Sequence, residues 1–143
     1  MRKNNVMSQF ATKDFEKLIG ELFNNNFSKS FTPEDVARVY NKKNVYLFTH
    51  EEDGHIVGMA TLYVVELLSR KLGVVEEVVT LKKYRNKGIA SNLIGQILDK
   101  SKKLKLTCVE LNVREDKPEI QSFYEKFGFY DRKNKSMRIW VNK

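Results

Sequence analysis

Hydrophobic and polar residues change their spacing partway through the segment from Val74 to Leu98. Its first part, Val74 to Thr80, is rich in β-branched residues, which favour a β-strand. A basic turn follows from Lys82 to Lys87. Beyond the turn, apolar residues recur at the spacing of an amphipathic helix, at Ile89, Leu93, Ile94, Ile97 and Leu98. The segment therefore predicts a strand that leads through a basic loop into a helix running to about Lys103.

The first forty residues predict a short strand and two helices. The strand is expected over Val6 to Thr12, with Thr12 or Asp14 as the cap of the helix that follows. Thr32-Pro33-Glu34-Asp35 predicts the start of the second helix, because Thr is a favoured N-cap, Pro fits the first turn and acids suit the positive end of the helix dipole. One face of the first helix carries Phe15, Leu18, Ile19 and Leu22.

The middle of the chain predicts an antiparallel hairpin and a third strand. Val45 to Thr49 and Ile56 to Leu68 flank the turn residues 51–54, which is the pattern of a hairpin. Gly58 stands early in the second arm, where a glycine often marks a bulge or a close approach. The third strand is expected from Leu72 to Leu81.

The last forty residues complete a mixed sheet. Cys108 to Val113 predicts a strand parallel to the third one, because a helical crossover separates the two. A last helix is expected from Pro118 to a C-cap at Gly128, and a strand from Met137 to Val141 is expected to close the sheet. The predicted fold class is α+β, with a central mixed, mostly antiparallel sheet and flanking helices.

Gly88 stands between the basic loop and the central helix. The first N–H groups of a helix have no intrahelical partner, and the helix dipole favours an anion there. A glycine leaves the backbone uncovered where phosphate oxygens would approach. This junction therefore predicts a phosphate-binding site.

Length and charge narrow the class of protein. The 143 residues predict one domain over residues 1–143. A net charge of +8 suits nucleic acid, an anionic membrane or a polyanionic small molecule, and a Lys-rich surface explains it equally well. Nucleic-acid binding rests on charge alone, and the basic cluster after the central helix has no interleaved aromatic residues, so we expect no nucleic-acid partner.

No targeting or membrane segment is expected from the pattern. The basic start Arg2-Lys3 is followed by polar residues, so we expect no signal peptide. No apolar stretch approaches the ~20 residues that a membrane span needs. We therefore expect a cytoplasmic protein without a membrane partner.

Two motifs resemble the hallmarks of the GNAT superfamily of N-acetyltransferases. The first hallmark is Arg/Gln-x-x-Gly-x-Gly/Ala at the start of the central helix, and it is matched by Arg85 to Ala90. The second is Tyr-x-x-x-Gly-Phe, and it is matched by Tyr124 to Phe129. Both motifs stand in the family's order of strands and helices, and the resemblance covers roughly residues 44 to 141. It implies a small single-domain enzyme with the GNAT fold.

The resemblance implies acetyl-coenzyme A as the cosubstrate and no metal. In the family, the loop grips the pyrophosphate, while backbone groups at the end of the preceding strand pair with the pantetheine arm. Lys117 stands where many members carry an Asn, and either contact with the coenzyme or simple solvation is open for it. The other residues so assigned are Val78, Val79, Thr80, Arg85, Asn86, Lys87, Gly88, Ile89, Ala90 and Ser91.

The implied reaction is acetyl transfer to a primary amine of a small molecule or peptide by direct attack. An amine with a pKa near 10 is protonated at neutral pH, so a base must remove a proton first. Glu76 and Glu77 are the candidate bases. Consecutive strand residues point to opposite faces, so only one of them can face the acceptor unless a bulge intervenes. Glu76 is slightly favoured; the alternative for both is a surface carboxylate.

Tyr124 is the candidate general acid. The resemblance places it where family members carry the tyrosine that protonates the departing thiolate. Its alternative role is a core aromatic residue beside Phe123 and Phe127. A second function is also compatible with the motifs, a catalytically inactive coenzyme A-binding module that serves as a sensor or interaction subunit. The acceptor, and whether the protein is a monomer or a homodimer, stay open.

Overall fold

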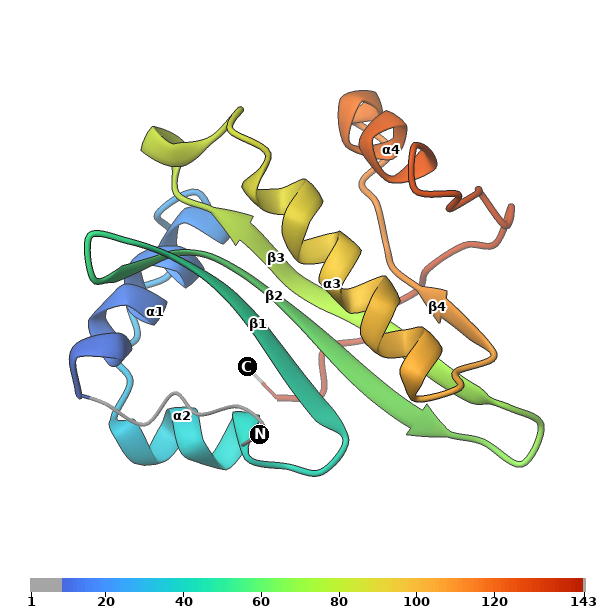
Figure 1. Ribbon diagram of the computed structural model, residues 1–143, viewed down its shortest axis with the longest axis horizontal. Helices are drawn as coiled ribbons and strands as arrows, with labels where there is room; N and C mark the ends of the chain where they lie inside the picture. Colours follow the sequence, from blue (N-terminus) through green and yellow to red (C-terminus); the bar gives the residue numbers. More distant parts are fainter. Residues whose placement is uncertain (1–8, 143) are drawn as a thin grey trace. The chain divides into compact units, whose positions relative to one another are not determined.

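A sheet in the strand order β1-β2-β3-β4 organises the N-terminal part of the chain. The computed structural model describes residues 9–142, and the chain divides after Glu110 into two compact units. The N-terminal unit contains all elements up to β4 (Figure 1). They are α1 (Gln9–Leu22), α2 (Pro33–Tyr40), β1 (Val45–Glu52), β2 (His55–Glu66), β3 (Lys71–Thr80), the short turn η1 (Lys82–Tyr84), α3 (Ile89–Lys103) and β4 (Cys108–Glu110).

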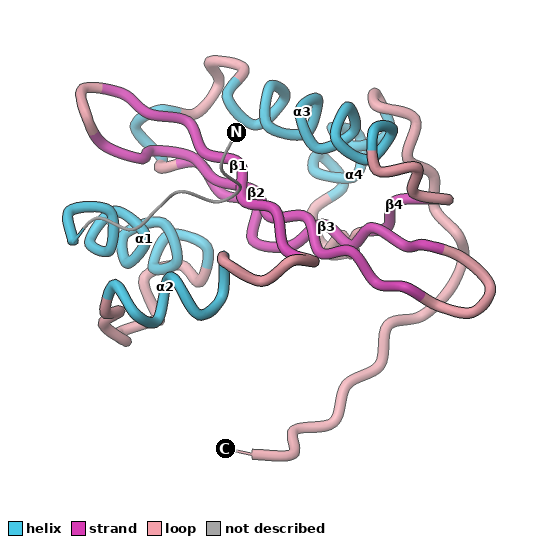
Figure 2. The backbone as a smooth tube through the Cα atoms, turned by 60° about the horizontal axis from the view of Figure 1, so that its bottom comes forward, coloured by secondary structure: helices cyan, strands magenta, loops and turns pink. Residues whose placement is uncertain are grey.

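The sheet is mixed, as its sequence predicted. Strand β2 pairs antiparallel with both β1 and β3, while β4 pairs parallel with β3 after the α3 crossover. Helices α1 and α2 lie on one face of the sheet and α3 on the other (Figure 2). Both faces of the central strands are therefore covered, which explains the almost continuous burial of β2 from Ile56 to Leu62.

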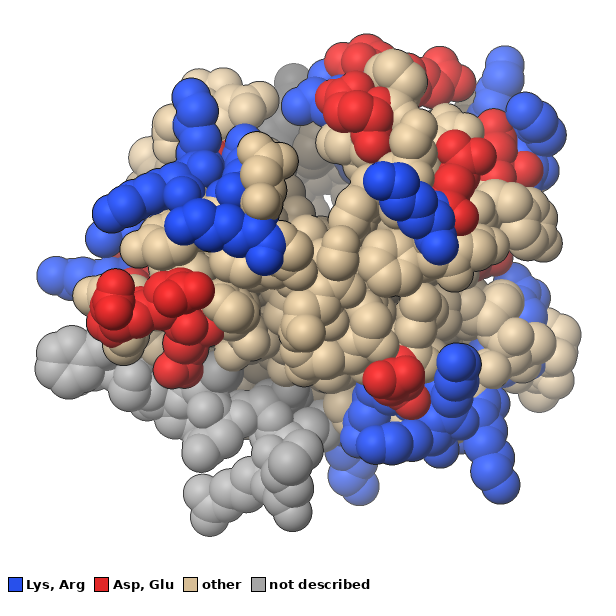
Figure 3. All heavy atoms as spheres, turned by 45° about the horizontal axis from the view of Figure 1, so that its top comes forward, with Lys and Arg blue, Asp and Glu red and all other residues tan. Residues whose placement is uncertain are grey.

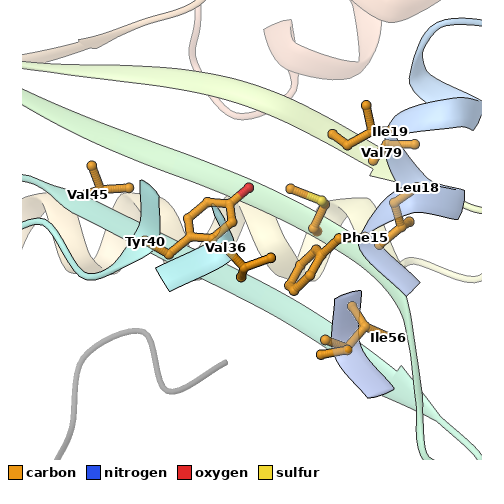
Figure 4. Close-up of a cluster of buried hydrophobic side chains, with 10 residues drawn as sticks. Phe15, Leu18, Ile19, Val36, Tyr40, Val45, Ile56 and Val79 are labelled. Atoms are coloured by element: carbon orange, nitrogen blue, oxygen red, sulfur yellow. The ribbon is translucent and has the colours of Figure 1, made fainter. Parts of the chain in front are cut away.

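The core on the α1 and α2 side joins residues from five elements. Phe15 and Leu18 of α1 pack with Val36 of α2 and with strand residues, and Leu18 is fully buried (Figure 4). On the opposite face, α3 buries Leu93, Ile94 and Ile97, in agreement with its apolar spacing. Each helix thus covers the sheet with the face that its sequence pattern predicted.

Two local predictions are confirmed in detail. Helix α2 begins with a capping box, in which the Asp35 N–H donates to Thr32 Oγ1 at 3.1 Å and the Thr32 N–H donates to Asp35 Oδ2 at 3.0 Å. Gly58 marks a close approach, since a Cβ there would stand 2.8 Å from Ile89 Cγ2. This glycine lets the start of α3 lie directly against β2.

The C-terminal unit, described from residue 111 to residue 142, contains helix α4 (Pro118–Glu125). Its chain turns at Gly128, which has a φ of +100°. Phe123, Tyr124 and Phe127 form edge-on ring contacts around the end of this helix, with centroids 5.0 to 5.5 Å apart. Helix α4 and the turn at Gly128 that follows it agree with the prediction from the sequence.

Three predictions of elements need correction. Residues 9–12 are helical rather than extended, because Ala11 continues the apolar face of α1, and Val6 to Ser8 lie outside the described residues. Met137 to Val141 forms no strand: its alternating pattern favours one, but no described strand pairs with it and Met137 is 92% exposed. Strand β4 ends at Glu110 instead of Val113. The single domain over residues 1–143 stays a prediction.

Candidate active site

A β-bulge at Glu77 interrupts strand β3. Glu76 pairs with Thr61 and Val79 pairs with Met59, so Glu77 and Val78 together oppose the one residue between those partners on β2. Glu77 has a φ of +52°, in the left-handed region that non-glycine residues seldom adopt. A bulge of this kind re-aims side chains and breaks the alternation of the strand.

The bulge brings both acidic side chains to the same face of the sheet. Glu76 shares the face of its cross-strand partner Thr61. Beyond the bulge, Val79 belongs to the core under α1 and α2. The Glu77 carboxyl lies near the hydroxyl of Tyr40, the last residue of α2, because each group shifts the pKa of the other. The bulge is the exception to the strand alternation that the sequence analysis allowed, and which acid faces the acceptor stays a prediction.

The electrostatics distinguish the two acids. Glu76 is exposed, whereas Glu77 is half-buried. Burial and the neighbouring Glu76 charge raise the pKa of Glu77, and the nearby hydroxyl of Tyr40 opposes them. Neither carboxylate forms an ion pair with Lys or Arg in the part of the chain from residue 9 to residue 142. Glu77 thus binds a proton more readily than an ordinary carboxylate does.

Two tyrosines that the sequence analysis did not select surround this carboxylate. Burial, followed by the Glu77 charge, raises the pKa of Tyr40 far above its usual value. Burial and the charges of Glu77 and Glu76 also raise the pKa of Tyr63 on β2. Both hydroxyls therefore stay protonated at neutral pH and can donate hydrogen bonds. Tyr40 and Tyr63 stand at positions whose spacing in the sequence predicts only an apolar face. No local pattern therefore marked them as site residues.

The start of α3 offers free backbone amides. Gly88 is the N-cap, with a φ of +79°, and no atom lies within 4 Å of the place where its Cβ would be. The first helical hydrogen bond runs from the Asn92 N–H to the Gly88 carbonyl at 3.0 Å. The N–H groups of Ile89, Ala90 and Ser91 precede that bond, as expected at a helix N-terminus. This arrangement leaves open space and unpaired donors where an anion would bind.

The basic loop before Gly88 is organised around an aromatic ring. The ammonium groups of Lys83 and Lys87 lie 5.6 and 5.5 Å from the centroid of the Tyr84 ring. Asn86 adopts a left-handed φ of +63°. Figure 3 shows Lys and Arg side chains (blue) that project from the face of the molecule turned toward the reader.

Arg85 is bound to the protein itself. Its Nε donates to the Thr80 carbonyl at 3.0 Å, and its Nη2 donates to Glu21 Oε1 at 2.7 Å. The guanidinium therefore connects the end of β3, the loop and helix α1. Sequence reasoning missed this contact, because Glu21 stands far away in the chain.

The second half of β3 extends beyond its pairing with β4. The two strands pair only from Leu72 to Val74 in the register of the described N-terminal unit. Val78, Val79 and Thr80 follow the last of these pairs, and the bulge precedes them. The backbone groups of Val78 to Thr80 on the β4 side of β3 have no partner in the sheet of this unit. A ligand with amide groups can hydrogen-bond to such an open strand edge as an added strand would.

The remaining two candidates lie in the C-terminal unit. Tyr124 on α4 is 8% exposed, and its ring lies 5.7 Å from that of Phe129. Burial raises the pKa of Tyr124 to about 12, so its hydroxyl carries a proton at neutral pH. Lys117 is half-buried at the start of α4. The structure brings Glu76 and Glu77 together with two tyrosines, and it leaves the roles of Tyr124 and Lys117 as predictions.

Among residues 9–142, no group of three or more His, Cys, Asp or Glu side chains is arranged to hold a metal ion. No helix within that range is both long and apolar enough to cross a membrane.

Comparisons with known proteins show the family of this chain and its fold. Residues 16–129 match the family described as acetyltransferase (GNAT) family. A putative acetyltransferase from Agrobacterium tumefaciens str. C58 is 22% identical over 95% of this chain and 97% of that one, with a TM-score of 0.81. Glucosamine-6-phosphate N-acetyltransferase from Arabidopsis thaliana is 22% identical over 99% and 97%, with a TM-score of 0.76. An aminoglycoside acetyltransferase from an uncultured soil metagenomic sample is 16% identical over 92% and 88%, with a TM-score of 0.80.

Proposed function

Because this chain belongs to the acetyltransferase (GNAT) family, we propose that it transfers an acetyl group from acetyl-coenzyme A to a primary amine by direct attack. The acceptor is an amine of a small molecule or a peptide. The observation that carries the proposal is the half-buried Glu77 carboxyl at the bulge of β3, in the same unit as the uncovered amides of α3. These two features supply a base and an anchor for an anionic donor.

The residues at the start of α3 fit a coenzyme diphosphate. Open space over Gly88 lets phosphate oxygens reach the backbone, and the amides of Ile89 to Ser91 are oriented as donors. Lys87 adds a positive charge beside them. The unpaired side of β3 at Val78 to Thr80 suits the amide groups of a pantetheine arm, and the N–H of Val79 or Thr80 would polarise the acetyl carbonyl. Acetyl-coenzyme A supplies the activated acetyl group as a thioester.

Glu77 is the base in this proposal. An acceptor amine arrives protonated, and a carboxylate with a raised pKa accepts its proton more readily than an ordinary one does. The sequence slightly favoured Glu76, but the position of Glu77 at the bulge, its burial and its raised pKa support Glu77 as the base. Glu76 contributes its charge, which raises the proton affinity of Glu77. The resemblance gives Tyr124 the role of general acid, and its protonated hydroxyl has that capacity.

The proposal is tested by release of free thiol from acetyl-coenzyme A with a panel of amines. The panel includes amino sugars and aminoglycosides, which the named neighbours suggest, and short peptides. We expect Glu77→Gln to lower kcat by about 10²-fold or more and to leave acetyl-coenzyme A affinity unchanged. Glu76→Gln is the matched control at the adjacent position, with a smaller loss. Tyr124→Phe is expected to lower kcat by about 10²-fold.

The alternative function gives a different result. A coenzyme-binding module without transfer would show heat of binding with acetyl-coenzyme A in calorimetry, but no thiol release or acetylated product with any amine. Full activity of Glu77→Gln would remove Glu77 from the mechanism. Absence of coenzyme binding would contradict the whole proposal.

A further inference from the structure

A pocket of about 400 Å³ opens on the α3 face of the sheet, at the end where β2 turns into β3. Tyr46 in its wall faces α3, because the ammonium group of Lys100 lies 5.1 Å from the centroid of the Tyr46 ring, while its neighbour Val45 belongs to the core under α1 and α2. Figure 1 shows that α3 ends toward this end of the sheet. Ligand sites in proteins measure ~300–1,000 Å³, so the pocket suits a small molecule.

The pocket is separate from the candidate active site. Its residue on β3 is Lys71, the first of that strand, whereas Glu77 stands six residues further along. Six strand residues span about 20 Å. The helix separates the two sites in the same way, since Ile89 is the first residue of α3 and Leu104, which lines the pocket, is its C-cap. The proposed transfer reaction therefore does not use this pocket.

Half of the pocket lining is apolar. The four side chains that form this apolar wall are half-buried, and they are Tyr46, Val64, Leu104 and Leu106. The start of β1 is fixed to the end of β2, because the Val64 N–H donates to the Asn44 carbonyl at 2.8 Å and Asn44 Nδ2 donates to the Val64 carbonyl at 3.4 Å. A concave apolar wall of this kind can bury the hydrocarbon part of a ligand.

The segment after α3 is held against the sheet. A Cβ at Gly73 of β3 would stand 2.9 Å from Leu106 Cδ1, so this glycine lets Leu106 lie directly on the strand. The Thr107 N–H donates to the Lys71 carbonyl at 2.8 Å, and the Leu106 N–H donates to the Ser101 carbonyl at 3.0 Å. The pocket is therefore preformed, and a ligand would bind with little cost for ordering its wall.

The charged side chains of the pocket favour an anion. Lys43 and Lys71 line it together with one acid, Glu66. Within residues 9–142, the ammonium group of Lys43 forms no ion pair. Lys71 Nζ lies 3.7 Å from Glu66 Oε1, and both side chains are exposed, at 48% and 74%. Such an exposed pair contributes little stability, so Lys71 can turn to a bound anion at small cost.

We propose that this pocket is a second binding site, which takes a small organic carboxylate with an apolar body. The carboxylate binds the ammonium groups of Lys43 and Lys71, and the body lies against the apolar wall. A single negative charge is favoured over two, because Glu66 lines the pocket and the negative end of the α3 dipole borders it at Leu104. This site does not depend on the proposed function.

The site is tested by NMR titration of the full chain with hexanoate. We expect the amide signals of Tyr46, Val64 and Leu106 to shift, while those of residues 88–91 do not. Hexanamide lacks the charge and acetate lacks the apolar body, so each should bind about tenfold more weakly than hexanoate. Saturation with acetyl-coenzyme A should leave the Kd for hexanoate unchanged. Shifts confined to residues 76–91, or no shifts at all, would overturn the inference and leave the proposed function as it stands.

Two variants of exposed pocket residues should change the affinity in opposite directions. Lys43→Ala should weaken hexanoate binding about tenfold, because it removes one of the two cations. Glu66→Gln should tighten binding about threefold, since it removes the acid and releases Lys71. Lys17→Ala is the matched control, because Lys17 is exposed on α1, on the other face of the sheet.

The pattern of affinities decides the proposal. Equal weakening in Lys43→Ala and Lys17→Ala would mean that only the overall positive charge attracts the anion, which overturns the site. Equal affinities for hexanoate and hexanamide would overturn the choice of an anion as the ligand. The expected opposite effects at Lys43 and Glu66, with no effect at Lys17, support the site whether or not the chain transfers acetyl groups.

Discussion

The Nη2 atom of Arg85 lies 2.7 Å from Oε1 of Glu21, a residue 64 positions earlier in the chain. The same guanidinium donates through Nε to the carbonyl of Thr80 at 3.0 Å. One side chain thus holds helix α1, the end of β3 and the basic loop in a fixed arrangement before Gly88. This contact stabilises the loop conformation that the coenzyme would meet.

Replacement of Glu21 by Ala should loosen that loop. Because the Arg85 side chain is 47% exposed, we expect a loss of stability of no more than about 1 kcal/mol. The KM for acetyl-coenzyme A should rise several-fold, about threefold to tenfold, since the loop must then be ordered on binding. Steady-state kinetics and thermal unfolding measure both effects. Glu66→Ala, which breaks the exposed pair with Lys71, is the control and should change neither. A lower KM would mean that Glu21 withholds Arg85 from the phosphates.

Glu77→Gln should stabilise the fold while it lowers the rate of transfer. A carboxyl whose folded pKa lies above the ordinary 4.5 stabilises the protein below that value and loses this contribution as the pH rises through the folded pKa. The neutral amide cannot ionise and keeps its contribution at neutral pH. We expect the free energy of unfolding to rise by on the order of 1 kcal/mol at pH 7 and by little at pH 4. Thermal unfolding at both values measures this, with exposed Glu51→Gln as the control. A destabilised variant at pH 7 would contradict the strained, half-buried state of Glu77.

Gly88→Glu should remove coenzyme binding. The new side chain would fill the open space over the amides of α3 and place a negative charge where phosphates are proposed. Gly54 is a matched control, because it has the same φ of +79° and the same open space in the β1–β2 turn. Both variants should lose about 1 kcal/mol of stability from the left-handed backbone. Calorimetry with acetyl-coenzyme A should detect binding to Gly54→Glu only. Tight binding by Gly88→Glu would place the phosphates elsewhere.

Gly58→Ala should destabilise the N-terminal unit. Its Cβ would stand 2.8 Å from Cγ2 of Ile89, a β-branched side chain that cannot easily rotate away. We expect a cost of about 1–3 kcal/mol, as for other overpacked cores. Gly95→Ala on α3, the helix that carries Ile89, has open space and should instead stabilise by about 0.5–1 kcal/mol. Denaturant unfolding of the two variants compares them directly, and equal stabilities would contradict the close approach.

Local signals explain why most of the fold was predictable. The capping box at Thr32 and Asp35, the turn between β1 and β2 and the apolar face of α3 are each encoded within a few residues. The two wrong strands lacked such support. Ala11 extends the helical face of α1, and the alternation from Met137 to Val141 cannot tell whether a partner strand exists. Pairing is a property of two segments, so one segment alone does not decide it.

By itself, the sequence determined that a strand, a basic loop with Gly88 and a helix follow one another, and that two adjacent acids stand within that strand. Only the tertiary structure decided which acid is buried and what it contacts. The left-handed bulge at Glu77 and the hydroxyl of Tyr40 come from the packing of β2, β3 and α2. The proton affinity of a carboxyl depends on burial and on charges nearby in space, and residues distant in the chain supply both.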